Sequence, residues 1–495
     1  MQNNEFSLPT EETLDPQDWT NMRALAHNMV DDMMDYLQNV AQRPVWTQIT
    51  EGAKSALNQP LPTEPTSPEQ VYEDFKNHVL PFNMGNIHPR FWSWVNGTGT
   101  AMGMMSDMLA SGMNPNNTIG EHAAMYVENQ VIEWLKTMLS YPSVGSGLLV
   151  SGGSLANITA LIVARNHFDS RIRATGNAAA GGQLVMYCSS ETHNCVFKAA
   201  DVIGIGNDHL RKIPVDADYQ IDIAVLKNAI LQDKSDGNIP FCIIGNAGTV
   251  NTGAIDPLSI LQEIALENNL WFHVDGAFGA IAKLDPAFDE RLKAIETADS
   301  VAFDLHKWLY MNYDCGCVLI KNATIHRAAY AQAASYLAHH ERGLASGNDP
   351  RGNFGLELSR SFRALKVWML LKEHGIEKYR RLIHQNLAQC FYLAQLVDNQ
   401  PLLELIAKPV MNVVCFRFKP EGLTNDELNA LNKEILMRLH EQGIAAPSYG
   451  LLNGRYAIRV ANVNHRSKNE DFEALVEGVL RIGKIIFEGE SDALH

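Results

Sequence analysis

Between residues 80 and 330, short apolar segments alternate with amphipathic stretches, and this alternation limits the possible folds more than any other feature of the chain. The segments that read as strands are 148–151, 184–188, 241–245, 271–275, 300–303 and 316–320. The stretches that read as helices are 121–139, 155–166, 223–233 and 258–268. Nearly continuous apolar strands are expected where helices cover both faces of a mainly parallel sheet. The pattern therefore predicts an open α/β sheet with its site beyond the carboxyl ends of the strands.

The regions on either side of this alternation predict two further units, as expected for 495 residues, which exceed what one core normally serves. Residues 16–44 have helical periodicity, and four prolines between 58 and 68 indicate an extended connector. Residues 377–398, 425–442 and 469–487 read as helices, with strands at 412–418 and 456–463 between them. We therefore predict an N-terminal helical segment (1–80) that packs on a partner subunit, a large α/β domain (81–370) and a small C-terminal α+β domain (371–495).

Composition excludes several classes of protein. A net charge of -16 argues against a nucleic-acid surface, which needs stripes of Lys and Arg. No apolar run approaches the roughly 20 residues of a membrane span, and the first residues are neither basic nor apolar, so no signal peptide is expected. The seven cysteines contain no CxxC pair, which favours reduced core thiols over a structural zinc site. We expect a cytoplasmic protein without a metal.

An acid and a lysine follow two successive predicted strands. Asp275 ends the strand in HVDGAFG (273–279), and Lys307 lies in DLHKW (304–308) after the next strand. A lysine can bond to a carbonyl cofactor once it loses its proton, and a carboxylate can keep a pyridine nitrogen protonated. Desolvation and nearby positive charge are expected to lower the pKa of Lys307. Together the two residues indicate pyridoxal phosphate chemistry, although separately Asp275 could cap a turn and Lys307 could be a surface lysine.

Two other strand ends carry candidate ligand-binding residues. SGGSLAN (151–157) leads from a strand into a helix, where glycines and a helix N-terminus favour an anion and Ser154 can cap the helix. His193 follows the next strand and could stack on a flat ring. Each feature also has an ordinary structural reading: a common strand-to-helix turn for the first, and a hydrogen-bonded structural histidine for the second.

These motifs, in this order, resemble the group II pyridoxal-phosphate-dependent decarboxylases. The resemblance covers about residues 70–485 and includes NIHPRFW (86–92) and YAIRV (456–460). It implies the aspartate-aminotransferase-like α/β fold (fold type I), with a large mainly parallel-sheet domain and a small C-terminal α+β domain. It also implies pyridoxal 5'-phosphate as the cofactor and a homodimer with shared active sites and an exchanged N-terminal segment.

The resemblance assigns roles to matching positions. Lys307 would form the Schiff base, Asp275 would bind the pyridine nitrogen, and His193 would stack on the ring. Residues that would contact the phosphate are Gly153, Ser154, Ser300 and His306, and Asn246 would lie near the ring. Residues that would line the substrate pocket are His88, Phe91 and Trp92.

The implied activity is decarboxylation of an L-amino acid through a quinonoid intermediate, with release of CO2 and an amine. The aromatic residues near position 92 favour an aromatic or apolar substrate, while Arg90 and Arg351 keep an acidic one possible. The chain departs from the family where Asp304-Leu305 replaces the usual Asn-Pro before His-Lys. The glycine-rich stretch 338–355, predicted to be a mobile lid, also lacks the family's tyrosine, whose place falls near Arg351.

Three alternatives stay open, and the missing tyrosine motivates the first two. The chain could be an aldehyde synthase, which couples decarboxylation to oxidative deamination. It could be another pyridoxal phosphate lyase or an aminotransferase. It could also be an inactive scaffold that binds the cofactor, although the presence of Asp275, His193 and Lys307 argues against that.

Overall fold

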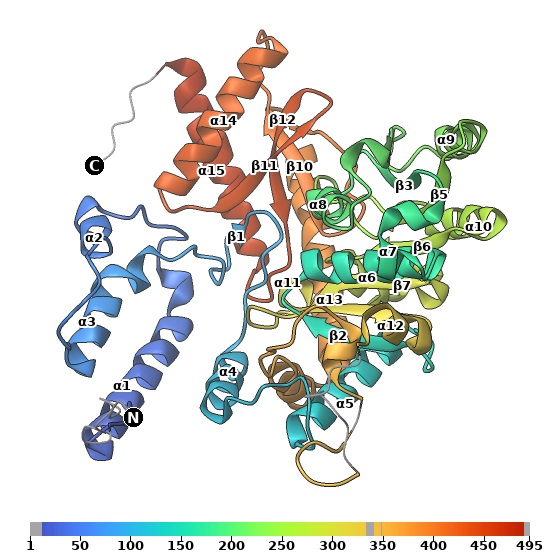
Figure 1. The fold of residues 1–495 in the computed structure, drawn as a ribbon. Coiled ribbons are helices and arrows are strands. Elements are labelled where there is room, and N and C mark those ends of the chain that lie inside the picture. The colour runs from blue at the N-terminus through green and yellow to red at the C-terminus, as the bar shows by residue number, and fades with distance from the viewer. Residues whose placement is uncertain (1–11, 333–340, 348, 490–495) are drawn as a thin grey trace, which may run out of the picture.

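A seven-stranded sheet forms the centre of the computed structural model, which describes residues 12–332, 341–347 and 349–489 (Figure 1). Its strand order is β2-β8-β7-β6-β5-β3-β4. The strands are β2 (Ser146–Val150), β3 (Leu184–Ser189), β4 (Leu210–Ile213), β5 (Ile239–Asn246), β6 (Trp271–Asp275), β7 (Ser300–Asp304) and β8 (Gly316–Ile320). The pairs from β4 to β7 are parallel, and β8 runs antiparallel to both of its neighbours. The predicted mainly parallel sheet is therefore confirmed.

Helices cover both faces of this sheet. They are α5 (Ala123–Met138), α6 (Gly153–Phe168), α8 (Asn194–Val202), α9 (Ile223–Ser235) and α10 (Leu258–Asn268). Successive residues of a strand point to opposite faces. Accordingly, Val185 and Tyr187 of β3 lie in one buried cluster with Leu135 of α5, while Met186 lies in another with Leu161 of α6. Because both faces are buried, the strands are apolar at nearly every position.

A second sheet carries the C-terminal part of the chain, with strand order β1-β11-β12-β10-β9. Its strands are β1 (Phe91–Trp92), β9 (Leu403–Leu405), β10 (Val413–Phe418), β11 (Ala446–Leu452) and β12 (Arg455–Ala461). α13 (Ala364–Asp398), α14 (Asn425–Glu441) and α15 (Asn469–Glu488) contribute to a third buried cluster with this sheet. β1 comes from the range predicted for the large domain yet pairs parallel with β11. The domain limits themselves stay a prediction.

The long helix α13 combines two predicted helices. A helix that the sequence predicts at 358–374 and the one at 377–398 correspond to its two halves, and the first half begins at Ala364. Gly375 interrupts its helical backbone with φ 66° and ψ 154°. Glycine adopts this positive φ without a Cβ clash, so the change of direction occurs at the break that the sequence predicts.

The N-terminal helices lie to one side of the main body (blue in Figure 1). They are α1 (Trp19–Gln38), α2 (Glu51–Ala56) and α3 (Pro68–His78). α1 buries only Leu25 and Tyr36, while Trp19 is 61% exposed and Leu61, between α2 and α3, is 87% exposed. This segment thus buries little apolar surface within its own chain.

The other helices are α4 (Ala101–Met113), α7 (Ile172–Thr175), α11 (Leu305–Trp308) and α12 (Ala323–Tyr330). In the described part of the chain, no helix combines the length and the apolar character needed to cross a bilayer.

Candidate active site

Two adjoining cavities lie at the carboxyl ends of the central strands. Their volumes are about 180 Å³ and about 370 Å³, and both are lined by Val95, His193, Ala277 and Lys307. The larger one falls within the roughly 300–1,000 Å³ of small-molecule sites. The structure therefore places the site at the edge of the sheet that the alternating pattern predicts.

Lys307 lies in α11, the short helix that directly follows β7. Its Nζ is 2.8 Å from Oδ2 of Asp304, the last residue of that strand. Burial opposes the charge on the amine, but the carboxylates of Asp304 and Asp275 outweigh burial and raise the pKa of Lys307. The predicted lowering of this pKa is therefore wrong for the protein alone, because the nearest charged neighbours of the amine are acids.

Asp275 is the last residue of β6 and lines the smaller cavity together with Lys307. Its side chain is buried, and Oδ1 accepts a hydrogen bond of 3.1 Å from the Ala277 amide. Burial raises the pKa of Asp275, while the positive charges of Lys307 and His193 act in the opposite direction. The structure thus brings the predicted acid and amine to one cavity.

The turn between β2 and α6 lines the larger cavity with Ser151, Gly152, Gly153 and Ser154. α6 begins at Gly153, and its N-cap, Gly152, has no side chain to satisfy the first amides. The expectation that Ser154 caps the helix is wrong, because Ser154 lies inside the first turn. A Cβ on Gly153 would lie 2.9 Å from Oδ2 of Asp304, so the close approach of these two elements requires glycine. Because these residues line the cavity, the uncapped amides at the start of α6 could hold an anion there.

His306 lines the same cavity. Its Nδ1 accepts a hydrogen bond of 3.1 Å from the Cys315 amide, and its ring stacks on Tyr313 with centroids 4.2 Å apart. These contacts fix the ring and leave Nε2 without a hydrogen bond among the described residues, 3.7 Å from Oδ2 of Asp304 and available to a ligand.

His193 and Asn246 hold the opposite part of the site. His193 is the N-cap of α8, where its Nδ1 accepts a hydrogen bond from the Cys195 amide, and its ring lines both cavities. Asn246 ends β5, and its Nδ2 donates to Thr192 (2.9 Å) and to Asp256 (2.7 Å). Both side chains reach the smaller cavity, as predicted.

Ser300 does not reach either cavity, which corrects the prediction that it contacts the phosphate. It is the first residue of β7 and therefore lies at the amino end of the strand, whereas the cavities lie at the carboxyl ends. Its hydroxyl accepts a hydrogen bond of 2.7 Å from Trp271 Nε1 and contacts His273 Nδ1 at 2.8 Å. Asp304, at the other end of the same strand, lines the larger cavity instead.

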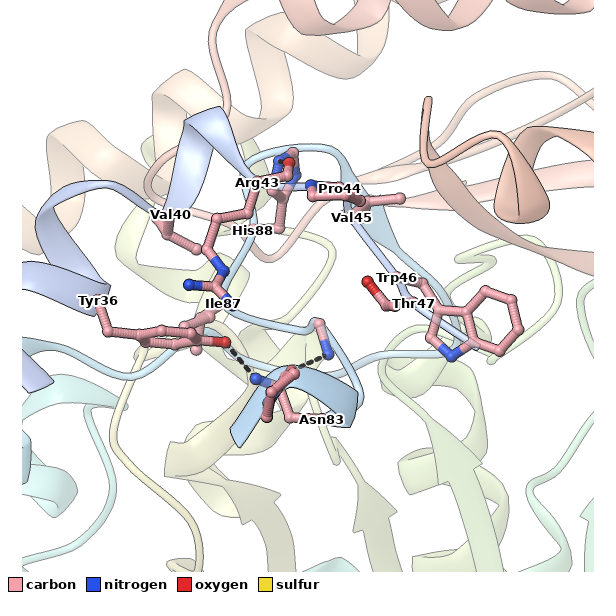
Figure 2. Close-up of a pocket in the computed structure, with 12 residues that line it drawn as sticks. Tyr36, Val40, Arg43, Pro44, Val45, Trp46, Thr47, Asn83, Ile87 and His88 are labelled. Carbon is pink, nitrogen blue, oxygen red and sulfur yellow. Dashed lines mark hydrogen bonds between the residues drawn. The ribbon is translucent and has the colours of Figure 1, made fainter. Parts of the chain in front are cut away.

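The predicted substrate residues His88, Phe91 and Trp92 also lie away from the two cavities. Trp92 belongs to β1 of the second sheet and is buried against α15, where it stacks on Phe472 with centroids 4.7 Å apart. Phe91 pairs with β11, in a separate small cluster. Figure 2 shows His88 in a small cavity near the N-terminal helices, where its Nε2 contacts the Arg43 carbonyl at 3.0 Å. The structure therefore corrects the assignment of all three to the pocket around Lys307.

Trp94 and Val95 line the smaller cavity in their place, together with Phe278. Trp94 has a positive φ of 52°, which turns the chain directly after the buried Trp92. Trp94 and Val95 could have been suspected from the sequence only because they follow Trp92 by two and three positions. The prediction chose the wrong members of one aromatic run because the run alone does not show which side chains enter a core.

Arg459 lies in the YAIRV segment (456–460), but the sequence predicts no role in the site for it. It lies in β12, is almost fully buried, and pairs with no carboxylate among the described residues. Its Nη1 donates to the Trp94 carbonyl at 2.8 Å, its Nε donates to the Asn251 carbonyl, and its Nη2 has no partner in the described part of the chain. Burial lowers its pKa to about 10, so it stays charged at neutral pH. A buried cation thus lies directly behind the wall of the smaller cavity.

Part of the predicted lid, residues 338–340 and 348, lies outside the described residues. Arg351, near the place of the family's tyrosine, begins a 3-10 helix that ends at Phe354. Its amide donates to the Thr118 carbonyl at 2.7 Å, and its side chain does not line the two cavities.

The residues of the site fit pyridoxal 5'-phosphate. One cavity offers an amine that could bond to an aldehyde and a buried acid that could face a ring nitrogen. The adjoining cavity offers a glycine-lined helix start that could hold a phosphate. In the described ranges, no group of three or more His, Cys, Asp or Glu side chains could hold a metal ion.

Comparisons with known proteins agree with this fit. Residues 51–419 match the family described as the pyridoxal-dependent decarboxylase conserved domain. The aromatic-L-amino-acid decarboxylase of Bacillus atrophaeus is 33% identical over 455 residues, which cover 91% of this chain and 93% of that protein. The phenylacetaldehyde synthase of Arabidopsis thaliana is 29% identical over 459 residues, 90% of this chain and 93% of that protein. The crystal structure of Oryza sativa TDC with PLP and tryptamine superposes with a TM-score of 0.87 at 25% identity, covering 96% of this chain and 100% of that one.

Proposed function

We propose that the substrate of this chain is an aromatic L-amino acid. The chain belongs to the pyridoxal-dependent decarboxylase family and is therefore a pyridoxal 5'-phosphate-dependent carboxy-lyase. The products are then CO2 and an aromatic amine. The observation that carries the proposal is the single cavity that joins Lys307 and Asp275 to the aromatic wall of Trp94 and Phe278.

Each part of the site has a task in this reaction. Lys307 would hold the cofactor through its aldehyde carbon, and Asp275 would hold the proton on the ring nitrogen. His193 would stack on the ring, and Asn246 would lie at its edge. Gly153, Ser154 and His306 would hold the phosphate at the start of α6. When bound, the cofactor supplies an electron-poor ring that accepts the electron pair left on Cα as CO2 departs.

The aromatic preference is supported by the cavity wall and by relatives. Trp94, Val95 and Phe278 present apolar surface beside the Lys307 amine. The names of the relatives include tyrosine and tryptophan decarboxylases, at 31% and 28% identity. An aromatic ring buries more apolar area against such a wall than an acidic side chain does.

A panel of L-amino acids tests the proposal. The expected result is CO2 release that is fastest with an aromatic substrate, with one amine formed per CO2 and neither ammonia nor peroxide. An aldehyde synthase is the second candidate, because synthases are among the similar proteins and Arg351 stands near the place of the family's tyrosine. Stoichiometric ammonia and peroxide would establish that candidate instead. Fastest turnover of an acidic amino acid would contradict the aromatic preference.

We expect Arg459 to anchor the substrate carboxylate, because it is a buried cation with a free N–H beside Trp94. Hydrogen bonds to charged groups contribute roughly 1.5–3 kcal/mol, so R459M should raise KM by about 10- to 100-fold. R459K keeps the positive charge, so its KM should rise less than that of R459M. Steady-state kinetics measures both variants, and an unchanged visible spectrum of the cofactor shows that the site remains intact. A KM like that of the unmodified protein in R459M would remove Arg459 from this role.

The chain is further proposed to form a cytoplasmic homodimer with shared active sites. The exposed apolar residues of the N-terminal segment, such as Trp19 and Leu61, support packing against a second copy. All seven cysteines are buried and unpaired, which agrees with a reducing compartment. Light scattering of the purified protein should give twice the mass of the chain, and a monomer would contradict the proposal.

A further inference from the structure

A chain of buried hydrogen bonds crosses the large sheet from the amino ends of its strands to the active-site acid. Trp271 Nε1 lies 2.7 Å from Ser300 Oγ, and Ser300 Oγ lies 2.8 Å from His273 Nδ1. His273 Nε2 lies 2.7 Å from Asn157 Oδ1. Asn157 Nδ2 lies 3.6 Å from Cys195 Sγ, and the Cys195 thiol lies 3.9 Å from Asp275 Oδ2. Five side chains thus connect the far end of β6 and β7 with the acid that lines the cavity.

The neighbours of this chain determine the direction of every hydrogen bond in it. An indole Nε1 can only donate, so the Ser300 hydroxyl accepts from Trp271 and gives its own proton to His273 Nδ1. Asn157 Nδ2 donates to the Gly153 carbonyl at 2.8 Å, so Asn157 Oδ1 is the atom that faces His273. His273 Nε2 must therefore carry the proton. One tautomer of a neutral imidazole satisfies the whole chain.

Burial keeps the imidazole in that neutral form. His273 has no exposed surface, and burial lowers its pKa to about 3. The described neighbours of its ring nitrogens, Ser300 and Asn157, are both uncharged. The ring therefore acts as a fixed dipole at neutral pH, with its N–H directed toward Asn157.

The last two members of the chain lead to the active-site acid. Asn157 lies in the second turn of α6, and its Nδ2 donates to the sulfur of Cys195 in α8. The Cys195 thiol in turn donates to Asp275 Oδ2, while the Ala277 amide donates to Oδ1. These donors stabilise the ionised carboxylate, which burial alone disfavours.

We infer that a relay of positioning residues holds the Asp275 carboxylate ionised and directed at the cavity; its members are Trp271, Ser300, His273, Asn157 and Cys195. The inference rests on the proposed function, in which Asp275 faces the ring nitrogen of pyridoxal 5'-phosphate. Ser300 and His273 would thus influence the cofactor without touching it, through the hydrogen bonds that lead to Asp275. A residue of this relay is a positioning residue, because it acts on the cofactor only through Asp275.

The test compares H273L, H273Q and N157A with the unmodified protein. H273L removes both ring nitrogens, whereas H273Q keeps an N–H donor for Asn157. N157A removes the link from His273 to Cys195, and thus to Asp275, and keeps a good helix former in α6. Two quantities are measured besides activity: the dissociation constant of pyridoxal 5'-phosphate and the pH midpoint of its visible band. In H273L and N157A the ring nitrogen of the cofactor should be less firmly protonated, so the ring withdraws less electron density from the nitrogen that joins it to Lys307. That nitrogen then holds its proton to a higher pH, so the pH midpoint of the visible band should rise.

H273L and N157A are expected to weaken cofactor binding at least about tenfold and to raise the midpoint by up to about one pH unit, the equivalent of a tenfold change. H273Q should stay within about threefold of the unmodified protein. H326L is the matched control, because His326 is also fully buried and hydrogen-bonded, to Ser146 and to the Phe354 carbonyl, away from both cavities. It should lower the melting temperature without changing either quantity.

Three results would overturn the relay: unchanged constants in H273L and N157A, equal changes in H326L, or an H273Q that behaves like H273L. If H273L does not fold, N157A and H273Q decide. A failure of the proposed function looks different, because the unmodified protein itself would then bind no pyridoxal 5'-phosphate and show no visible band.

Discussion

Replacement of Lys307 by alanine is expected to remove the visible absorption of the purified protein and to slow decarboxylation by at least about 10³-fold. Lys307 is the amine that both cavities share, so its loss removes the group that would hold the cofactor aldehyde. Absorption spectroscopy of the protein after incubation with excess pyridoxal 5'-phosphate, together with CO2 release, measures the effect.

K307R separates the chemistry of the amine from its charge. Loss of the amine leaves the buried carboxylate of Asp304 without its partner at 2.8 Å, so K307A should also be less stable. Arginine can keep this ion pair, but its guanidinium stays protonated and cannot bond to an aldehyde. K307R should therefore fold normally and still lack the visible band. A visible band of normal intensity in either variant would show that another residue holds the cofactor.

Much of the fold could be predicted because the central strands are buried on both faces. The fold class, an aspartate-aminotransferase-like α/β fold, is confirmed by solved decarboxylases of similar fold. β6 and β8 begin and end at the predicted residues, since their apolar runs have clear limits. β4 and β1 were missed for opposite reasons. β4 has polar Arg211 and Lys212 at its centre, and β1 has two residues and no periodicity at all.

The site could be predicted only where its residues end a strand or follow one within a few positions. Asp275 and Lys307 reach the cavity because parallel strands bring their carboxyl ends to one edge. Ser300 belongs to the same strand as Asp304, but strand direction places it at the opposite edge. The pKa of Lys307 was misjudged because a linear sequence shows that Asp304 is near the lysine but not that its carboxylate reaches Nζ. Arg459 comes from the second sheet, and only the packing of the two sheets brings it behind Trp94.

Replacement of Asp275 by asparagine is expected to lower kcat by about 10²–10³-fold, the usual effect of removing one preorganised electrostatic group from an active site. The two side chains have nearly the same shape, so the hydrogen bond from the Ala277 amide can persist. What is lost is the negative charge that keeps a ring nitrogen protonated, and with it the ability of the ring to accept electrons from Cα. Cofactor binding should weaken, while Lys307 should still give a visible band.

D304N is the matched control, because it makes the same change to the other buried acid beside Lys307. Asp304 pairs with the amine at 2.8 Å and lines the larger cavity, whereas Asp275 lines the smaller one. Asp304 is the acid that raises the pKa of Lys307 most, so D304N should keep most of the activity and mainly lower that pKa. Equal losses in the two variants would mean that total negative charge, and not its place at the end of β6, supports the reaction. An active D275N would show that no carboxylate is needed at the ring nitrogen.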